Sequence, residues 1–252
     1  MPHPLPPEPV VKVVIPALNE ERALPKVLSA IPDFVAQVVV ADNGSTDATA
    51  EVARTFGATV VNVPEPGYGR ACMAGVAAAG ACDVLVFLDG DASDHPEDMA
   101  DILAPILSGE ADMVIGARVG AGVAKGSLTL PQRWGNWLAC TLMRWIWGSP
   151  YSDLGPFRAV RRDAYAWLGM SAPTFGWTVE MQVRGLKAGL RGTEVPVRYR
   201  PRIGTSKISG TVRGVVLAGY YILGTIAWEA LRPLPAPEPL PQRSPERLPD
   251  VA

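Results

Sequence analysis

Cysteine is scarce in this chain, and so is net charge. The sequence has 252 residues but only three cysteines, Cys72, Cys82 and Cys140, whose spacing matches neither a zinc site nor a redox pair. Each lies in an apolar context, so we predict buried, reduced thiols in a cytoplasmic protein. The formal net charge is −2, which argues against nucleic acid as a partner.

Long hydrophobic runs are absent as well. The longest apolar run covers residues 214–228 and is shorter than the ~20 residues that a membrane-spanning helix needs. Residues 1–9 are rich in proline and have neither the basic nor the apolar region of a signal peptide. Residues 232–252 are also rich in proline and cannot form a core, so we expect disorder at both ends of the chain.

Between these ends, strand and helix signals alternate through the first half of the chain. Short β-branched runs are followed by segments in which apolar residues recur with helical spacing. This alternation predicts an α/β fold, with a mostly parallel sheet and helices on both of its faces. Ser45 or Thr46 is the expected N-cap of the second helix. The expected strands cover residues 10–15, 37–41, 58–63, 83–88, 112–116, 155–160 and 193–199, and the expected helices cover 20–31, 46–56, 68–80, 96–107, 131–147, 161–168, 179–189 and 210–231.

Acidic residues and glycines gather at the carboxyl ends of the expected strands, where ligands bind in open α/β sheets. Asp89-Gly90-Asp91 follows the fourth strand and is the sharpest of these features. Its two carboxylates repel each other, and Mg²⁺ or Mn²⁺ between them could hold diphosphate oxygens. Alternatively, the segment is a solvated acidic loop, because Asp and Gly favour turns.

Three segments taken together favour the first interpretation. They are VVIPALNE at residues 13–20, VVADNGSTD at 39–47 and FLDGD at 87–91. Their order and spacing resemble the family-2 glycosyltransferases, which have the nucleotide-binding A-type fold. Within that family the chain is most similar to transferases that move a sugar onto dolichyl or another polyprenyl phosphate. Residues 67–71, 153–158 and 204–207 support this similarity, which covers roughly residues 10–228.

The resemblance implies an inverting, metal-dependent enzyme that uses a nucleoside-diphosphate sugar of the UDP or GDP type. Asp89 and Asp91 would bind Mg²⁺ or Mn²⁺. Asn43 follows Asp42 where the family usually has a second acid, so the identity of the base stays open. The implied catalytic residues are Asp91, Asp153, Arg202 and Lys207, and the implied nucleotide-sugar site comprises Pro16, Ala17, Asn19, Glu20, Asp42, Gly69, Asp89, Gly90 and Arg118.

The acceptor is less sharply indicated than the donor. A lipid phosphate is already ionised, whereas a hydroxyl acceptor would need a base such as Asp153. Arg118 and Arg133 could face donor or acceptor phosphates, or solvent. Two other classes stay open: a nucleotidyltransferase, although residues 16–20 lack its glycine- and lysine-rich loop, and an inactive nucleotide-sugar-binding scaffold.

We expect a catalytic domain over residues 10–209 and an apolar helix over 210–231. Four tryptophans within residues 134–147, and the apolar run after them, suit the interface of a bilayer, although both helices could instead pack as core. No acid occurs between Val195 and Trp228, so the basic residues there suit a diphosphate, a lipid phosphate or an anionic leaflet. We therefore predict peripheral attachment to the inner, cytoplasmic face of a membrane.

Overall fold

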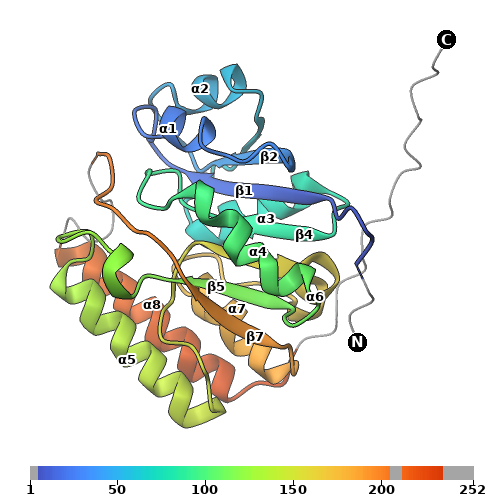
Figure 1. Cartoon of the computed structure of the whole chain (residues 1–252). Coiled ribbons are helices and arrows are strands. Elements are labelled where there is room, and N and C mark those ends of the chain that lie inside the picture. The colour runs from blue at the N-terminus through green and yellow to red at the C-terminus, as the bar shows by residue number, and fades with distance from the viewer. Residues whose placement is uncertain (1–4, 205–211, 235–252) are drawn as a thin grey trace.

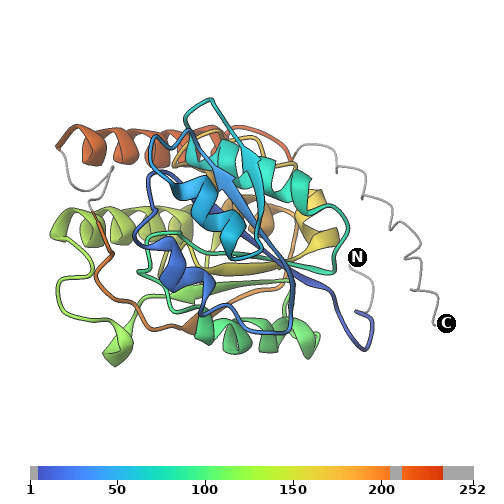
Figure 2. The same ribbon diagram turned by 90° about the horizontal axis from the view of Figure 1, so that it is seen from above.

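The computed structural model describes residues 5–204 and 212–234, so Lys207 lies outside the described residues. These residues form a seven-stranded sheet with helices on both faces (Figures 1 and 2). The strands are β1 (Val11–Ala17), β2 (Val35–Asp42), β3 (Thr59–Asn62), β4 (Val84–Phe87), β5 (Met113–Ala117), β6 (Arg158–Arg161) and β7 (Gly192–Pro196). The helices are α1 (Leu24–Leu28), α2 (Thr49–Thr55), α3 (Tyr68–Ala79), α4 (Met99–Leu107), α5 (Leu130–Trp147), α6 (Arg162–Leu168), α7 (Trp177–Lys187) and α8 (Val212–Ala230), with short 3-10 helices η1 (Pro96–Asp98) and η2 (Gly120–Gly122).

Neighbouring strands pair in the order β3-β2-β1-β4-β6-β5-β7. Every pairing is parallel except those of β6, which runs antiparallel to β4 and β5. The predicted α/β fold with a mostly parallel sheet is therefore confirmed. Because β6 is reversed, the residues that precede it lie at the same edge as the residues that follow β4 and β5.

The core has two layers, one on each face of the sheet. Val13 and Ile15 of β1 pack in the layer that contains α1 and α4, whereas Val14 packs in the layer that contains α3 and α7. Successive side chains of a strand point to opposite faces, so a strand covered on both sides is apolar throughout. The three cysteines are buried and free of disulfides, as predicted.

The predicted start of the second helix is wrong. α2 begins at Thr49 after Ala48, and neither Ser45 nor Thr46 caps it. Ser45 Oγ instead accepts a hydrogen bond from the backbone N–H of Asn19, and the backbone N–H of Thr46 donates to Asn19 Oδ1. These contacts join the loops that follow β1 and β2, so the two residues fix strand ends and not a helix end.

α5 and α8 lie alongside each other in both views (Figures 1 and 2). Thr129 and Gln132 form a capping box at the start of α5, and Gly148 ends it with a φ of 67°. No described helix is both long enough and apolar enough to cross a membrane. Both helices nevertheless leave large apolar side chains exposed, which are Leu130, Trp134, Trp137, Trp145 and Ile146 on α5 and Val216, Leu217, Tyr220, Leu223 and Trp228 on α8.

Candidate active site

The loops that follow β1 and β2 are tied together at the carboxyl edge of the sheet. Asn19 has a φ of 53°, and its Oδ1 lies 2.7 Å from the backbone nitrogen of Thr46. Asp42 Oδ1 accepts a hydrogen bond from the backbone N–H of Ser45 at 3.0 Å. Pro16 and Ala17 lie in β1 directly beside Ala41 and Asp42 of β2. The structure therefore brings together the residues that the first two motifs predicted for the nucleotide.

The contacts of the Asn43 side chain explain why an asparagine stands where the family usually has a second acid. Its amide nitrogen donates to the carbonyl oxygens of Val63 and Glu65, at 3.1 and 2.8 Å, and its Oδ1 accepts from the backbone N–H of Gly67 at 2.8 Å. A carboxylate cannot donate hydrogen bonds, so an aspartate there could not hold these carbonyls. Asn43 thus fastens the loop after β3 to the loop after β2.

The start of α3 is packed against the segment that precedes α7. A Cβ atom on Gly69 would lie 1.9 Å from the carbonyl oxygen of Ala172, so only glycine fits there. The backbone N–H of Arg70 donates to the carbonyl of Pro173 at 3.0 Å, and that of Gly67 is held by Asn43. Two N–H groups that could have held an anion at this helix start therefore already have partners within the protein.

Three aspartates crowd the loop after β4. Asp89 Oδ1 accepts from the Tyr68 hydroxyl at 3.1 Å, and the backbone N–H of Asp89 donates to Asp94 Oδ2 at 3.2 Å. Burial, together with the charge of Asp91, raises the pKa of Asp89 to about 7. Burial, together with the charges of Asp89 and Asp91, also raises the pKa of Asp94. Its Oδ1 is buried and has no hydrogen-bond partner among the described residues. Gly90 lies within this loop against Ile15.

Asp91 is partly neutralised by an arginine. Its Oδ1 accepts from the backbone N–H of Ser93 at 2.9 Å, and its Oδ2 lies 3.2 Å from Arg202 Nη1. Arg202 Nη2 lies 2.7 Å from Glu20 Oε1. Arg202 thus joins the loop after β1 to the acidic loop after β4, although the residues are far apart in sequence.

The acidic loop suits a hard divalent cation. Within the described ranges no group of three His, Cys, Asp or Glu side chains is arranged to hold a metal ion. Mg²⁺, however, usually binds through one or two carboxylates and completes its shell with water and substrate phosphates. Burial, followed by the charge of Asp91, raises the pKa of Asp89, and Asp94 Oδ1 has no hydrogen-bond partner among the described residues, so a cation here would stabilise the ionised carboxylates. Asp89 and Asp91 therefore fit the predicted metal ligands.

Arg118 and Asp153 form a buried, two-pronged ion pair. Arg118 Nε lies 2.8 Å from Asp153 Oδ2, Nη2 lies 2.7 Å from Oδ1, and the backbone N–H of Arg118 also donates to Oδ2. Although burial opposes ionisation, the charge and hydrogen bonds of Arg118 hold the pKa of Asp153 below its usual range. Both oxygens of this carboxylate are occupied, so it is a weak proton acceptor.

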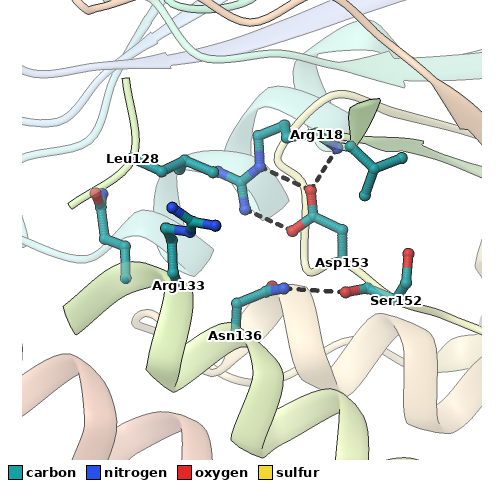
Figure 3. Close-up of a pocket in the computed structure, with 8 residues that line it drawn as sticks. Arg118, Leu128, Arg133, Asn136, Ser152 and Asp153 are labelled. Carbon is teal, nitrogen blue, oxygen red and sulfur yellow. Dashed lines mark hydrogen bonds and ion pairs between the residues drawn. The ribbon is translucent and has the colours of Figure 1, made fainter. Parts of the chain in front are cut away.

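This ion pair lies on the wall of a pocket of about 150 Å³ (Figure 3). The side chains of Arg118 and Arg133 both reach into it. No carboxylate lies within ion-pair distance of Arg133 in the part of the chain that the structure describes. The guanidinium of Arg133 is thus available to bind an anion in the pocket. Its lining consists of Arg118, Val119, Leu128, Gln132, Arg133, Asn136, Ser152 and Asp153.

Two residues that no motif indicated hold the loop that carries Asp153. Asn136 of α5 accepts from the backbone N–H of Leu154 at 2.8 Å and donates to the carbonyl of Ser152 at 3.0 Å. Glu194 of β7 accepts from the backbone N–H groups of Ser152 and Asp153, at 2.7 and 3.0 Å. Long-range contacts of this kind leave no local signal in the sequence.

Comparison with known proteins places this geometry in a family. Residues 12–168 match the family model of glycosyl transferase family 2. The chain is 40% identical over 213 residues to an uncharacterized glycosyltransferase of Mycobacterium tuberculosis, covering 82% of this chain and 94% of that protein. It is 31% identical over 238 residues to undecaprenyl-phosphate mannosyltransferase of Micrococcus luteus, covering 88% and 97%.

A solved structure shares the architecture. Glucosyl-3-phosphoglycerate synthase of Mycobacterium tuberculosis, in complex with Mn²⁺, UDP-glucose and phosphoglyceric acid, matches with a TM-score of 0.72 at 25% identity. The match covers 89% of this chain and 81% of that one. The family model spans more than half of the chain, and both relatives are matched over most of their length. The chain therefore belongs to glycosyl transferase family 2 and has the A-type glycosyltransferase fold, with a polyprenyl-phosphate sugar transferase among its relatives.

Proposed function

We propose that this protein transfers a hexose from a nucleoside-diphosphate sugar, of the UDP or GDP type, to a polyprenyl phosphate, with inversion at the anomeric carbon. One observation carries the choice of acceptor: Asp153 is held as a carboxylate by Arg118, and Arg133 reaches into the same pocket. This arrangement suits an acceptor that is already ionised, because Asp153, the one carboxylate in the described lining of the pocket, is a weak proton acceptor.

The donor would lie over the joined loops after β1, β2 and β4. Pro16, Ala17, Asn19 and Asp42 would line the nucleoside, and Asp42 can accept an N–H of the base. Asp89 and Asp91 would hold Mg²⁺ or Mn²⁺, which stabilises charge on the departing nucleoside diphosphate. The remaining residues proposed for the donor are Glu20, Gly69, Gly90, Arg202 and Lys207, of which Lys207 lies outside the described residues. Arg118 is proposed to contact the phosphates of both the donor and the acceptor.

The acceptor phosphate would bind in the pocket beside Arg118 and Arg133. One of its oxygens attacks the anomeric carbon from the side opposite the diphosphate. A carbon–oxygen bond to the acceptor forms while the bond to the diphosphate breaks, so the configuration inverts and no proton need move. Asp153 would act by holding Arg118 in place for the phosphate, and would serve as a base only for a hydroxyl acceptor.

The exposed apolar faces of α5 and α8 support a membrane-bound acceptor. α5 carries Arg133 and Asn136 in the wall of the pocket and exposes Trp134 and Trp137 beside them in sequence. Tryptophan side chains favour the boundary between headgroups and acyl chains. A helix pair lying on the inner leaflet would therefore bring the pocket close to lipid headgroups, as expected for a peripheral membrane protein.

The test is nucleoside diphosphate release by the full chain from a panel of UDP- and GDP-sugars. The assay includes Mg²⁺ or Mn²⁺ and is run with no acceptor, a short polyprenyl phosphate, or phosphoglyceric acid. We expect release to rise with the lipid phosphate and to be lost in Asp91→Ala. A response to phosphoglyceric acid alone would replace the lipid with a small phosphorylated acceptor, as the solved relative's ligands suggest. Donor binding without release under any condition would instead indicate an inactive nucleotide-sugar-binding protein.

A further inference from the structure

Arg202 bridges two carboxylates that come from different strand ends. Its Nη2 lies 2.7 Å from Glu20 Oε1, and its Nη1 lies 3.2 Å from Asp91 Oδ2. The Arg202 side chain is 26% exposed and each of the two carboxylates is 9% exposed. Partly buried charges are screened less by salt than exposed ones, so this bridge is a substantial interaction.

Both oxygens of Asp91 are occupied in this arrangement. Oδ1 accepts from the backbone N–H of Ser93 at 2.9 Å and from its hydroxyl at 2.5 Å, and Oδ2 faces Arg202. A divalent cation needs a carboxylate lone pair directed toward it. The Ser93 contacts lie within one tight turn, whereas Arg202 approaches on a long side chain. Of these contacts, the one with Arg202 can therefore give way most easily when a metal approaches Oδ2.

The backbone on either side of Arg202 is hydrogen-bonded to the acidic loop. The guanidinium can therefore change partners while the backbone of Arg202 stays beside Asp91. The backbone N–H of Ile203 donates to the Asp91 carbonyl at 2.9 Å, and that of Arg200 donates to the Ser93 carbonyl at 3.0 Å. Arg202 Nε is buried with no hydrogen-bond partner among residues 5–204 and 212–234. This unsatisfied N–H is suited to an oxygen of an incoming diphosphate.

The geometry points to Arg202 as a resident counter-ion of Asp91 that competes with the metal and then moves to the diphosphate. This inference rests on the proposed donor chemistry. A divalent cation that binds alone displaces the Arg202 guanidinium from Asp91, and the guanidinium gains no new partner in return. When the cation arrives with a nucleoside diphosphate, the guanidinium gains phosphate oxygens in exchange for the carboxylate. Metal and nucleotide should therefore bind cooperatively, each strengthening the binding of the other.

The test measures binding of Mn²⁺ alone to the full chain by the electron paramagnetic resonance signal of free Mn²⁺. We expect Arg202→Gln to bind Mn²⁺ roughly tenfold more tightly than the wild type, as expected for removing a partly buried ion pair. Arg198→Gln is the matched control, because Arg198 carries the same charge four residues away but pairs with Asp98. We expect its Mn²⁺ affinity to stay within about twofold of wild type, because the half-exposed Arg198 pairs with Asp98 and its charge is screened by solvent and salt. Circular dichroism checks that both variants fold.

Adding UDP or GDP separates this inference from the proposed function. We expect the nucleotide to strengthen Mn²⁺ binding more in the wild type than in Arg202→Gln. If Arg202→Gln binds Mn²⁺ alone no more tightly than the wild type, while the wild type binds Mn²⁺ with nucleotide, only the role of Arg202 is overturned. If the wild type binds no Mn²⁺ even with either nucleotide, the proposed donor chemistry itself is wrong.

Discussion

Glu229 near the end of α8 fixes this helix to α7. Its Oε1 accepts from Arg184 Nε at 3.0 Å, and its Oε2 accepts from Lys187 Nζ at 3.0 Å. Arg184 also pairs with Glu180 at 2.8 Å. The Glu229 side chain is 2% exposed and that of Arg184 is 7% exposed, so water cannot replace a lost partner. We expect Glu229→Gln to destabilise the fold strongly.

The size of the effect follows from the partners that remain. The substitution keeps the shape of the side chain but places a neutral amide between two cations. Losing one partner of a buried ion pair costs roughly 3–5 kcal/mol. Arg184 keeps Glu180, and an amide oxygen still accepts a hydrogen bond, so we expect a loss of about 2–3 kcal/mol. In a domain of this size each kcal/mol lowers Tm by about 2–4 °C, which gives a fall of roughly 4–12 °C.

Thermal and urea unfolding at pH 7, followed by circular dichroism, measure this loss. Glu65→Gln is the control, because it makes the same chemical change in an exposed pair. Glu65 is 76% exposed and lies 3.2 Å from Arg70 Nε. Its substitution should change the free energy of unfolding by less than about 0.5 kcal/mol. If the two variants prove equally stable, the buried charges do not hold α8 to α7 and the reasoning fails.

Three further predictions test other parts of the structure. Gly69→Ala should destabilise the protein by about 1–3 kcal/mol in urea unfolding, because its Cβ would collide with a backbone carbonyl, whereas Gly219→Ala, with open space around it, should be neutral or stabilising. The lowered pKa of Asp153 means that its ion pair stabilises the fold above the ordinary aspartate pKa of ~3.9 and is lost as pH falls further. Asp153→Asn should therefore be less stable than wild type at pH 7, with a difference that shrinks toward pH 3, and an equal difference at both values would refute the pairing. Trp137→Ser should weaken co-sedimentation with anionic vesicles, while Trp167→Ser on α6 should not, and equal losses would argue against α5 as the contact.

The proximity of the loops proposed for the donor could be predicted because their residues directly follow strands. In a parallel sheet the strand ends meet at one edge, so Asn19, Asp42 and Asp89 were expected to come together once three strands were recognised. The structure places the loops of Asn19 and Asp42 in contact and adds Tyr68 as a partner of Asp89. Short motifs and the expectation of a parallel sheet were sufficient to predict the proximity of these loops.

The rest depends on contacts between distant residues. Arg118 and Asp153 are 35 residues apart, and their pairing requires the reversed strand β6, whose direction no local pattern indicated. The family resemblance implies a nucleotide-sugar contact for Gly69, whereas the structure gives a packing reason for the glycine, the close approach of the Ala172 carbonyl. The sequence shows Asn43 only as a departure from a motif, whereas in the structure its side-chain amide holds the loop after β3.

The reversed strand β6 has a consequence for how this protein can diversify. β1, β2, β3 and β4 form a continuous parallel block, and most of the residues proposed to hold the donor lie at or after the ends of its strands, whereas Arg118 and Arg202 follow β5 and β7. The pocket is built instead from residues 118–153, which leave the carboxyl end of β5, include α5 and return to the same edge through the loop before the reversed strand β6. The backbone hydrogen bonds between β6 and β4 do not depend on side-chain identity, so the stretch before β6 can change in sequence while the donor block keeps its pairing. The proposed function then implies that donor and acceptor preference vary separately, so exchanging this stretch between relatives should change the acceptor while leaving the nucleotide unchanged.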